Sequence, residues 1–248
     1  MILAESCSVN DVGDGRKRVV ADGSTVDLAG ELDFSRPATS LVEVGFPGEM
    51  QQFGVGTIGF GEWSAREVGV VAFDQEYAYQ GGRFRIGSAV ITDDFTRVQT
   101  LAHMGVWEGS NFSVKTQQLG GEPTALISLF EQIAIVEREL GVELQPKLSG
   151  VEVKRTGSFV PRVLKLVPGL GIVTVRQLSE ELVSGLPEWN GYPAAGGELF
   201  VLGEGEGATL VLVGDSAFTS IVPDASSLES AVLAGAMGLV AKWTPPVS

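Results

Sequence analysis

Histidine and cysteine each occur once in this chain of 248 residues. The single cysteine, Cys7, excludes an intrachain disulfide. Together with His103 it leaves too few imidazole and thiolate ligands for the usual zinc or iron sites. A serine and histidine mechanism on any fold would have to use His103 as its base. These scarcities disfavour a conventional reaction centre, and we expect neither a metal nor another cofactor.

From the pattern of apolar residues we expect neither a signal peptide nor a membrane-spanning segment. Its first residues have neither a basic opening nor a long apolar stretch. The most apolar candidate helix, residues 228–243, is interrupted by Gly235, Gly238 and Lys242 and is shorter than the roughly 20 residues that cross a bilayer. We therefore expect no membrane insertion and a cytoplasmic location, although incorporation into a virion and export without a signal are also compatible with the sequence.

Basic residues are outnumbered, with 17 lysines and arginines against 31 aspartates and glutamates, so the net charge is −14. Such a charge repels phosphate backbones, and we expect no nucleic-acid partner. Residues 145–177 reverse the trend, because they hold six basic side chains and one acidic one. One interpretation is a surface for an acidic partner; the other is a strand pair whose charges face acidic groups of the same molecule. The candidate partner contacts are Lys154, Arg155, Arg162 and Lys165.

What the sequence does contain is a pattern of short strands punctuated by glycine. Gly81-Gly82 separates two strand-like runs and predicts a tight hairpin. Beyond this turn, Arg83 and Arg85 are expected on the solvent-facing side of the second strand. Pro168-Gly169 and the loop 203–207 predict two further hairpins. The chain is therefore expected to be rich in antiparallel sheet.

Two main helices are expected, over about 122–141 and 225–243. Apolar residues recur at helical spacing in the first segment, and Pro223 and Asp224 precede the second. The predicted fold is α+β, predominantly antiparallel β-sheet. Each half reads as strands followed by a helix, which suggests subdomains over 1–145 and 146–248, with one compact unit as the alternative. The two halves show no residue-level repeat.

Gly54, Gly56 and Gly59 have the spacing of a dinucleotide-binding fingerprint. That motif needs a buried strand before its first glycine and a helix beginning at its last. The sequence "GEMQQF" before Gly54 is not a buried parallel strand, and the residues after Gly59 predict a strand instead of a helix. We therefore interpret the three glycines as part of a bent or bulged strand.

Two function hypotheses follow. The leading one is a non-catalytic protein-interaction or structural subunit of a larger assembly, such as a virion or secretion-apparatus component, that binds a protein partner or self-associates. The alternative is a small-molecule-binding or hydrolytic protein with a site near His103, Trp107 and Ser216. Gly214-Asp215-Ser216 resembles the nucleophile block of GDSL-type hydrolases over three residues, without the Asp-x-x-His that this family carries near its carboxyl end. A partly buried structural role is the more frequent one for a histidine such as His103.

Overall fold

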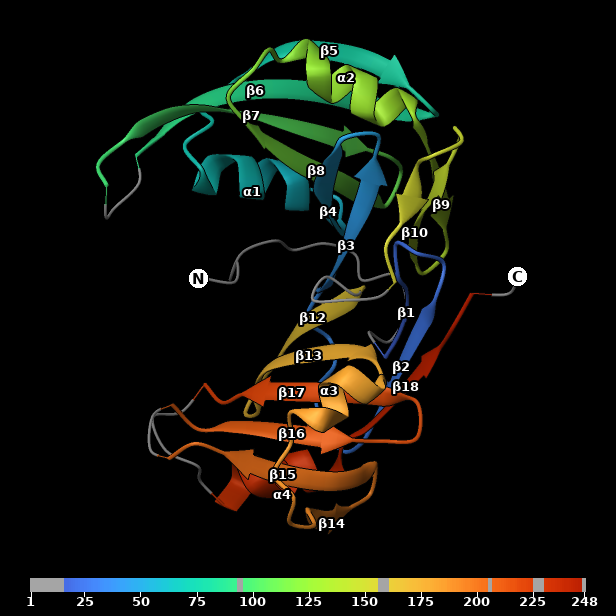
Figure 1. Cartoon of the computed structure of the whole chain (residues 1–248), viewed down its shortest axis with the longest axis vertical. Coiled ribbons are helices and arrows are strands. Elements are labelled where there is room, and N and C mark those ends of the chain that lie inside the picture. Colours follow the sequence, from blue (N-terminus) through green and yellow to red (C-terminus); the bar gives the residue numbers. More distant parts are fainter. Residues whose placement is uncertain (1–15, 93–95, 156–160, 205–206, 225–229, 247–248) are drawn as a thin grey trace.

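The computed structural model describes residues 16–92, 96–155, 161–204, 207–224 and 230–246 (Figure 1). The structure is 14% helical and 53% strand, with mostly antiparallel sheets, so the expected α+β class is confirmed. Within the described ranges, no helix is both long and apolar enough to cross a membrane.

Two sheets make up the fold. The larger one contains β3 (Ala38–Phe46), β4 (Glu49–Thr57), β5 (Phe73–Tyr79), β6 (Gly82–Thr92), β7 (Gln99–Glu108), β8 (Phe112–Leu119), β11 (Glu152–Val153), β12 (Arg162–Val167), β13 (Gly171–Gln177), β14 (Tyr192–Ala194), β15 (Gly197–Leu202), β16 (Thr209–Val213) and β17 (Ala217–Val222). The smaller one contains β1 (Lys17–Val19), β2 (Thr25–Ala29), β9 (Ile133–Arg138), β10 (Gly141–Pro146) and β18 (Val240–Thr244). The helices are α1 (Phe60–Glu67), α2 (Thr124–Glu131), α3 (Glu180–Ser184) and α4 (Ser230–Gly238).

The larger sheet contains the same strand order twice. Its first half runs β3-β4-β8-β7-β6-β5, and its second half runs β12-β13-β17-β16-β15-β14. The helices occupy matching places: α1 and α3 follow the first hairpin of each half, and α2 and α4 precede β9 and β18. The chain therefore contains two copies of one strand-and-helix unit.

Backbone hydrogen bonds support this correspondence at equivalent turns. The N–H of Gly109 donates to the carbonyl of Phe112 between β7 and β8, and the N–H of Gly214 donates to the carbonyl of Ala217 between β16 and β17, both at 2.9 Å. Similarly, the residue after each helix, Gln132 or Leu239, donates its N–H to the carbonyl three residues earlier, at 3.2 and 3.3 Å. The two units thus agree in detail although their sequences do not.

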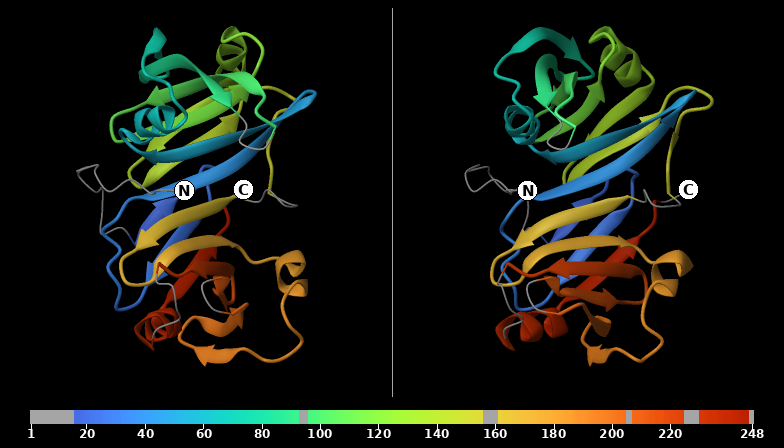
Figure 2. Two further views of the ribbon diagram at one scale, coloured as in Figure 1. Left: turned by 90° about the vertical axis from the view of Figure 1, so that its left-hand side faces the viewer. Right: turned by 60° about the vertical axis from the view of Figure 1, so that its left-hand side comes forward.

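The two units are joined through both sheets (Figure 2). Strand β3 of the first unit pairs with β12 of the second, and β18 at the end of the second unit returns to pair with β2. One large buried apolar cluster draws residues from both halves of the chain. The strand pairing crosses residue 146, which favours the single-unit alternative, while the boundary between 145 and 146 stays a prediction.

This shared pairing predicts that the two halves unfold together. Trp63 and Trp107 lie in the first half and Trp189 and Trp243 in the second, so 5-fluorotryptophan places two reporters in each. In a urea titration followed by fluorine NMR, we expect all four native resonances to disappear with the same midpoint, because unfolding one half would expose the strand edges and core of the other. Two separate midpoints, one for each pair of tryptophans, would contradict this.

Both predicted main helices are shorter than expected. Helix α2 ends at Glu131, and the rest of the predicted segment forms strand β9, whose six residues all pair with β10. Helix α4 ends at Gly238 and is followed by β18, while residues 225–229 lie outside the described ranges. The reason is the same in each case: β-branched residues occur after the helix, and a neighbouring strand is available to pair with them.

The prediction for the three glycines was wrong in one respect, because helix α1 begins directly after Gly59. Gly59 has a φ of 85°, which favours glycine, and precedes the first helical residue. The predicted hairpin turns at Gly81-Gly82 and Pro168-Gly169 are present, joining β5 to β6 and β12 to β13. A hairpin also joins β15 to β16 around the predicted loop, of which residues 205–206 are not described.

Candidate functional site

The middle of the larger sheet exposes one face beside the contact between the two units. Along β12, Arg162, Leu164 and Leu166 are half-buried, whereas the residues between them are buried. Because side chains alternate between the two faces of a strand, these three lie on the face opposite the core. Leu41 on β3 and Arg176 on β13 are their half-buried neighbours.

Three cations lie in one line across this face. Arg176 is directly opposite Arg162 in the register of β13 and β12, and Arg162 is opposite Leu41. The line continues through Gly54 on β4 to Lys115 on β8. A Cβ atom at Gly54 would lie 3.2 Å from Cε of Lys115 and 3.3 Å from Cδ2 of Leu41, so the lysine side chain lies over this glycine beside the leucine. We call Lys115, Arg162 and Arg176 the basic row.

The charges of the basic row are only partly compensated: Arg162 interacts electrostatically with the buried Glu43 carboxyl, and Nζ of Lys115 lies 5.5 Å from the centre of the Phe60 ring. Among the described residues, Arg162 and Arg176 make no side-chain ion pair or hydrogen bond, and like charges directly opposite each other destabilise a sheet. Burial lowers the pKa of Lys115, and burial together with the neighbouring Arg162 lowers the pKa of Arg176. Burial also raises the pKa of the Glu43 carboxyl, an effect that Arg162 partly opposes. A bound anion would relieve the repulsion between the arginines.

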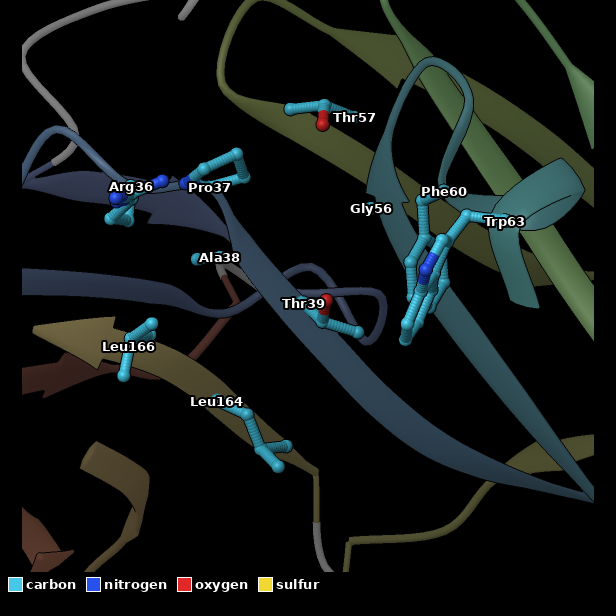
Figure 3. A pocket seen from close by; sticks show the side chains of 10 residues that line it. All are labelled: Arg36, Pro37, Ala38, Thr39, Gly56, Thr57, Phe60, Trp63, Leu164 and Leu166. Carbon is cyan, nitrogen blue, oxygen red and sulfur yellow. The ribbon is translucent and has the colours of Figure 1, made fainter. Parts of the chain in front are cut away.

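An apolar pocket of about 110 Å³ opens beside the basic row (Figure 3). Leu164 and Leu166 of β12 line one side, and Phe60 and Trp63 of α1 line the other. Thr39 of β3 lies between them. Arg36, Pro37, Ala38, Gly56 and Thr57 complete the lining. We call this cavity the sheet pocket.

Glycine at position 56 allows the aromatic wall of the sheet pocket to form. A Cβ atom there would lie 2.5 Å from Cγ of Phe60, which is closer than real side chains approach. The side chains of Phe60 and Lys115 therefore cover the strand face at Gly56 and Gly54. This packing accounts for the two glycines without a bound nucleotide.

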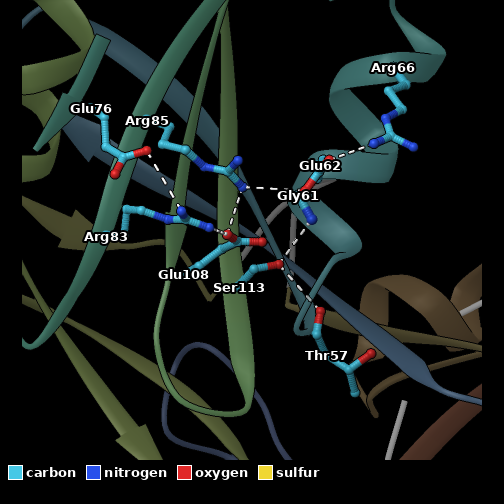
Figure 4. A network of polar contacts seen from close by, with 9 residues as sticks. All are labelled: Thr57, Gly61, Glu62, Arg66, Glu76, Arg83, Arg85, Glu108 and Ser113. Atoms are coloured by element: carbon cyan, nitrogen blue, oxygen red, sulfur yellow. Dashed lines mark hydrogen bonds and ion pairs between the residues drawn. The ribbon is translucent and has the colours of Figure 1, made fainter. Parts of the chain in front are cut away.

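Helix α1 is fixed to the sheet by a polar network (Figure 4). Ser113 accepts a hydrogen bond of 2.9 Å from the N–H of Gly61 at the start of the helix. The buried Glu108 carboxylate accepts hydrogen bonds from Arg83 at 3.1 Å and Arg85 at 2.6 Å, and Arg85 also lies 3.7 Å from Glu62 of the helix. Because Phe60 and Trp63 belong to α1, the network also fixes the positions of their side chains over the sheet.

The four predicted partner contacts fall into different environments. Lys165 is 2% exposed, lies on the core side of β12 and donates to the carbonyl of Arg36, so it is not available at the surface. Lys154 pairs with Glu152, and Arg155 donates to the Asp22 carbonyl at 3.1 Å and lies 3.5 Å from its carboxylate. These pairs correspond to the intramolecular alternative. Arg162 alone of the four belongs to the basic row.

His103 and Ser216 are not brought together. His103 on β7 is 3% exposed, with Nδ1 2.8 Å from the Ser88 hydroxyl and Nε2 3.2 Å from the Gly121 carbonyl. Ser216 lies before β17 in the other unit, where its hydroxyl accepts the N–H of Trp243 at 3.1 Å. Trp107 is buried and donates its indole N–H to the Tyr79 carbonyl. His103 therefore has the environment of a structural histidine.

Sequence reasoning did not single out Lys115, Arg176, Phe60 or Trp63. Arg176 lies within the basic segment 145–177, but the predicted two-residue turn at Pro168-Gly169 would place Arg162 opposite Val175. The observed connection has three residues, 168–170, and places Arg162 opposite Arg176. No comparable signal existed for Lys115, because β8 reaches β3 only through β4. The aromatic pair depended on a helix that the pattern did not predict.

Within the described ranges, no group of three or more histidine, cysteine, aspartate or glutamate side chains has a metal-binding arrangement. Comparisons of this chain with protein-family models, curated proteins and solved structures found no match.

Proposed function

We propose that this protein is a non-catalytic interaction subunit of a larger assembly, such as a virion or secretion apparatus, and that it binds an acidic segment of a partner protein on the basic row. The observation that carries the proposal is the directly opposed, half-buried pair Arg162 and Arg176, which makes no ion pair or hydrogen bond with a carboxylate of the described residues, although Arg162 interacts electrostatically with the buried Glu43 carboxyl. Like charges that lie opposite each other lower the stability of the folded protein. A bound anion removes this repulsion, so the relief contributes to the free energy of binding.

The surrounding charge supports a localised acidic segment. The chain as a whole carries −14, so a uniformly anionic polymer would be repelled over most of the surface. A short acidic segment in the partner can reach the basic row while the rest of the partner avoids the acidic surface. The hydrolytic or small-molecule alternative has less support, because His103 and Ser216 lie in different units.

Charge reversal of the two arginines tests this proposal. In affinity purification from the native host, we expect R162E/R176E to lose a partner that the wild-type chain retains. The affinity of the chain for this partner should fall roughly 30-fold or more, since breaking a buried charge pair costs about 2 kcal/mol or more. Binding of the wild type should also weaken as salt increases. The measurement is quantitative mass spectrometry of the purified complexes, followed by titration calorimetry with the purified partner.

The matched control is R97E/K242E, which makes the same change in net charge at two exposed residues outside the basic row. This control should retain the partner. Equal recovery with R162E/R176E and wild type at low salt would refute the proposed function, provided that circular dichroism shows both variants to be folded.

A further inference from the structure

We propose that the sheet pocket receives one aliphatic side chain of the acidic segment, so that the recognised extended strand carries an acidic residue and a leucine, isoleucine or valine two residues apart, as in Glu-x-Leu. This inference rests on the proposed function, because it adds a second, apolar contact to the same partner segment. It assigns a protein segment as the ligand of the pocket and an aliphatic side chain as the group that the pocket binds.

The size of the pocket limits the side chain that it can take. A cavity of about 150 Å³ holds benzene. At about 110 Å³, the sheet pocket accommodates a branched aliphatic group and is too small for an indole ring. Its walls are formed largely by Leu164, Leu166, Phe60 and Trp63, so an apolar group is favoured inside it.

The spacing between charge and pocket gives the separation of the two residues along the partner segment. Arg162 in the basic row and Leu164 in the pocket wall are alternate residues on one face of β12, about 6.6 Å apart along the strand. An extended peptide places its own alternate side chains on one face at the same spacing. In a helix, residues two apart do not face the same way. The match is therefore to an extended Glu-x-Leu type of segment.

The polar groups of the face suit this arrangement. The partner's carboxylate would lie between Arg162 and Arg176, where it can accept hydrogen bonds from both guanidinium groups. The side chain of Lys115 approaches the same row from the other side of Leu41. The pocket and the basic row thus provide two different contacts that a single short segment can make together.

Short synthetic peptides test this inference directly. The probe is a fluorescent extended peptide containing Glu-x-Leu among serine, threonine and glycine, with Glu-Leu, Glu-x-Gly and Gln-x-Leu as comparison peptides. We expect fluorescence anisotropy to show Glu-x-Leu binding roughly 10-fold or more tightly than Glu-x-Gly, because burying an aliphatic side chain contributes on that scale. Glu-Leu should behave like Glu-x-Gly, since adjacent side chains of a strand point to opposite faces.

Variants of the pocket provide the second arm. Thr39→Phe fills the pocket and should remove the advantage of Glu-x-Leu over Glu-x-Gly. Thr174→Phe is its control, because Thr174 pairs with Leu164 on the next strand but does not line the pocket. Leu166→Ala, which enlarges the pocket, should shift the preference from Glu-x-Leu towards Glu-x-Phe, and this readout does not depend on the stability of the filled variant.

The outcomes separate this inference from the proposed function. Equal binding of Glu-x-Leu and Glu-x-Gly would overturn the aliphatic contact, while loss of the partner in R162E/R176E would still support the basic row. A different result would overturn the assignment to a protein segment: dodecanoate binds to the wild type and not to Thr39→Phe, and no peptide binds. Partner recovery unaffected by R162E/R176E would instead refute the proposed function itself.

Discussion

Replacing Glu108 by alanine is expected to destabilise the protein by about 3 to 5 kcal/mol, the scale measured when one member of a buried ion pair is removed. Glu108 is 7% exposed and is the shared acceptor of Arg83 and Arg85. Arg85 is itself buried, and its Nε has no hydrogen-bond partner among the described residues. Among the described residues, removal of the carboxylate would leave this guanidinium with the more distant Glu62 carboxylate, at 3.7 Å, and the Phe73 ring.

The measurement is urea unfolding followed by circular dichroism. The loss expected for Glu108→Ala is a large part of the 5 to 15 kcal/mol that typically separates folded from unfolded domains. The matched control is Glu76→Ala, which removes a largely exposed carboxylate 3.7 Å from Arg83 and should cost less than about 1 kcal/mol. If both substitutions shifted the unfolding midpoint equally, the Glu108 carboxylate would not be the centre of the network.

The network also shows why the sequence pattern misplaced Arg85. Strand alternation in "GGRFRI" indicated that Arg83 and Arg85 faced solvent, and Arg83 is indeed exposed. Arg85 lies on the same face but is covered, with its guanidinium 4.3 Å from the centre of the Phe73 ring and beside Glu62 of α1. The sequence did not predict helix α1, so nothing indicated that this face had a cover. One missed helix therefore accounts for the wrong environment of Arg85.

Local signals predicted the parts of the fold that depend on neighbouring residues. The turns at Gly81-Gly82 and Pro168-Gly169 follow from residue types at fixed short spacings. The pairing of β3 with β12 and of β2 with β18 joins segments far apart in the chain. No periodicity in one sequence specifies such partners, and the basic row depends on them.

The two units also explain how a repeat can be present without being visible in the sequence. Each unit conserves strand order and turn geometry, which backbone hydrogen bonds determine. The side chains at equivalent places differ: two residues before the residue that follows each helix is Phe130 in α2 and Met237 in α4. Phe130 is 1% exposed and Met237 is 43% exposed. The units therefore share a backbone and use different cores.

This difference predicts a large effect at one of the two equivalent positions. Phe130→Ala is expected to destabilise the protein by about 3 to 5 kcal/mol, because it leaves a cavity in the core. The Phe130 ring lies 4.3 Å from Phe84 and 5.7 Å from Phe53 between ring centres, so three aromatic side chains lose contacts together. Urea unfolding followed by circular dichroism gives the change in free energy.

The internal duplication supplies the control for this experiment. Met237→Ala truncates the exposed counterpart and should change stability by less than about 0.5 kcal/mol. The backbone carbonyls of the two residues accept equivalent hydrogen bonds. The Phe130 carbonyl accepts from the Tyr79 hydroxyl at the end of β5, and the Met237 carbonyl accepts from the Ala195 N–H directly after β14, both at 2.8 Å. Alanine keeps both carbonyls, so the comparison isolates the side chains. Equal losses at the two positions would mean that the second helix contributes as much to the core as the first, contrary to the exposed position of Met237.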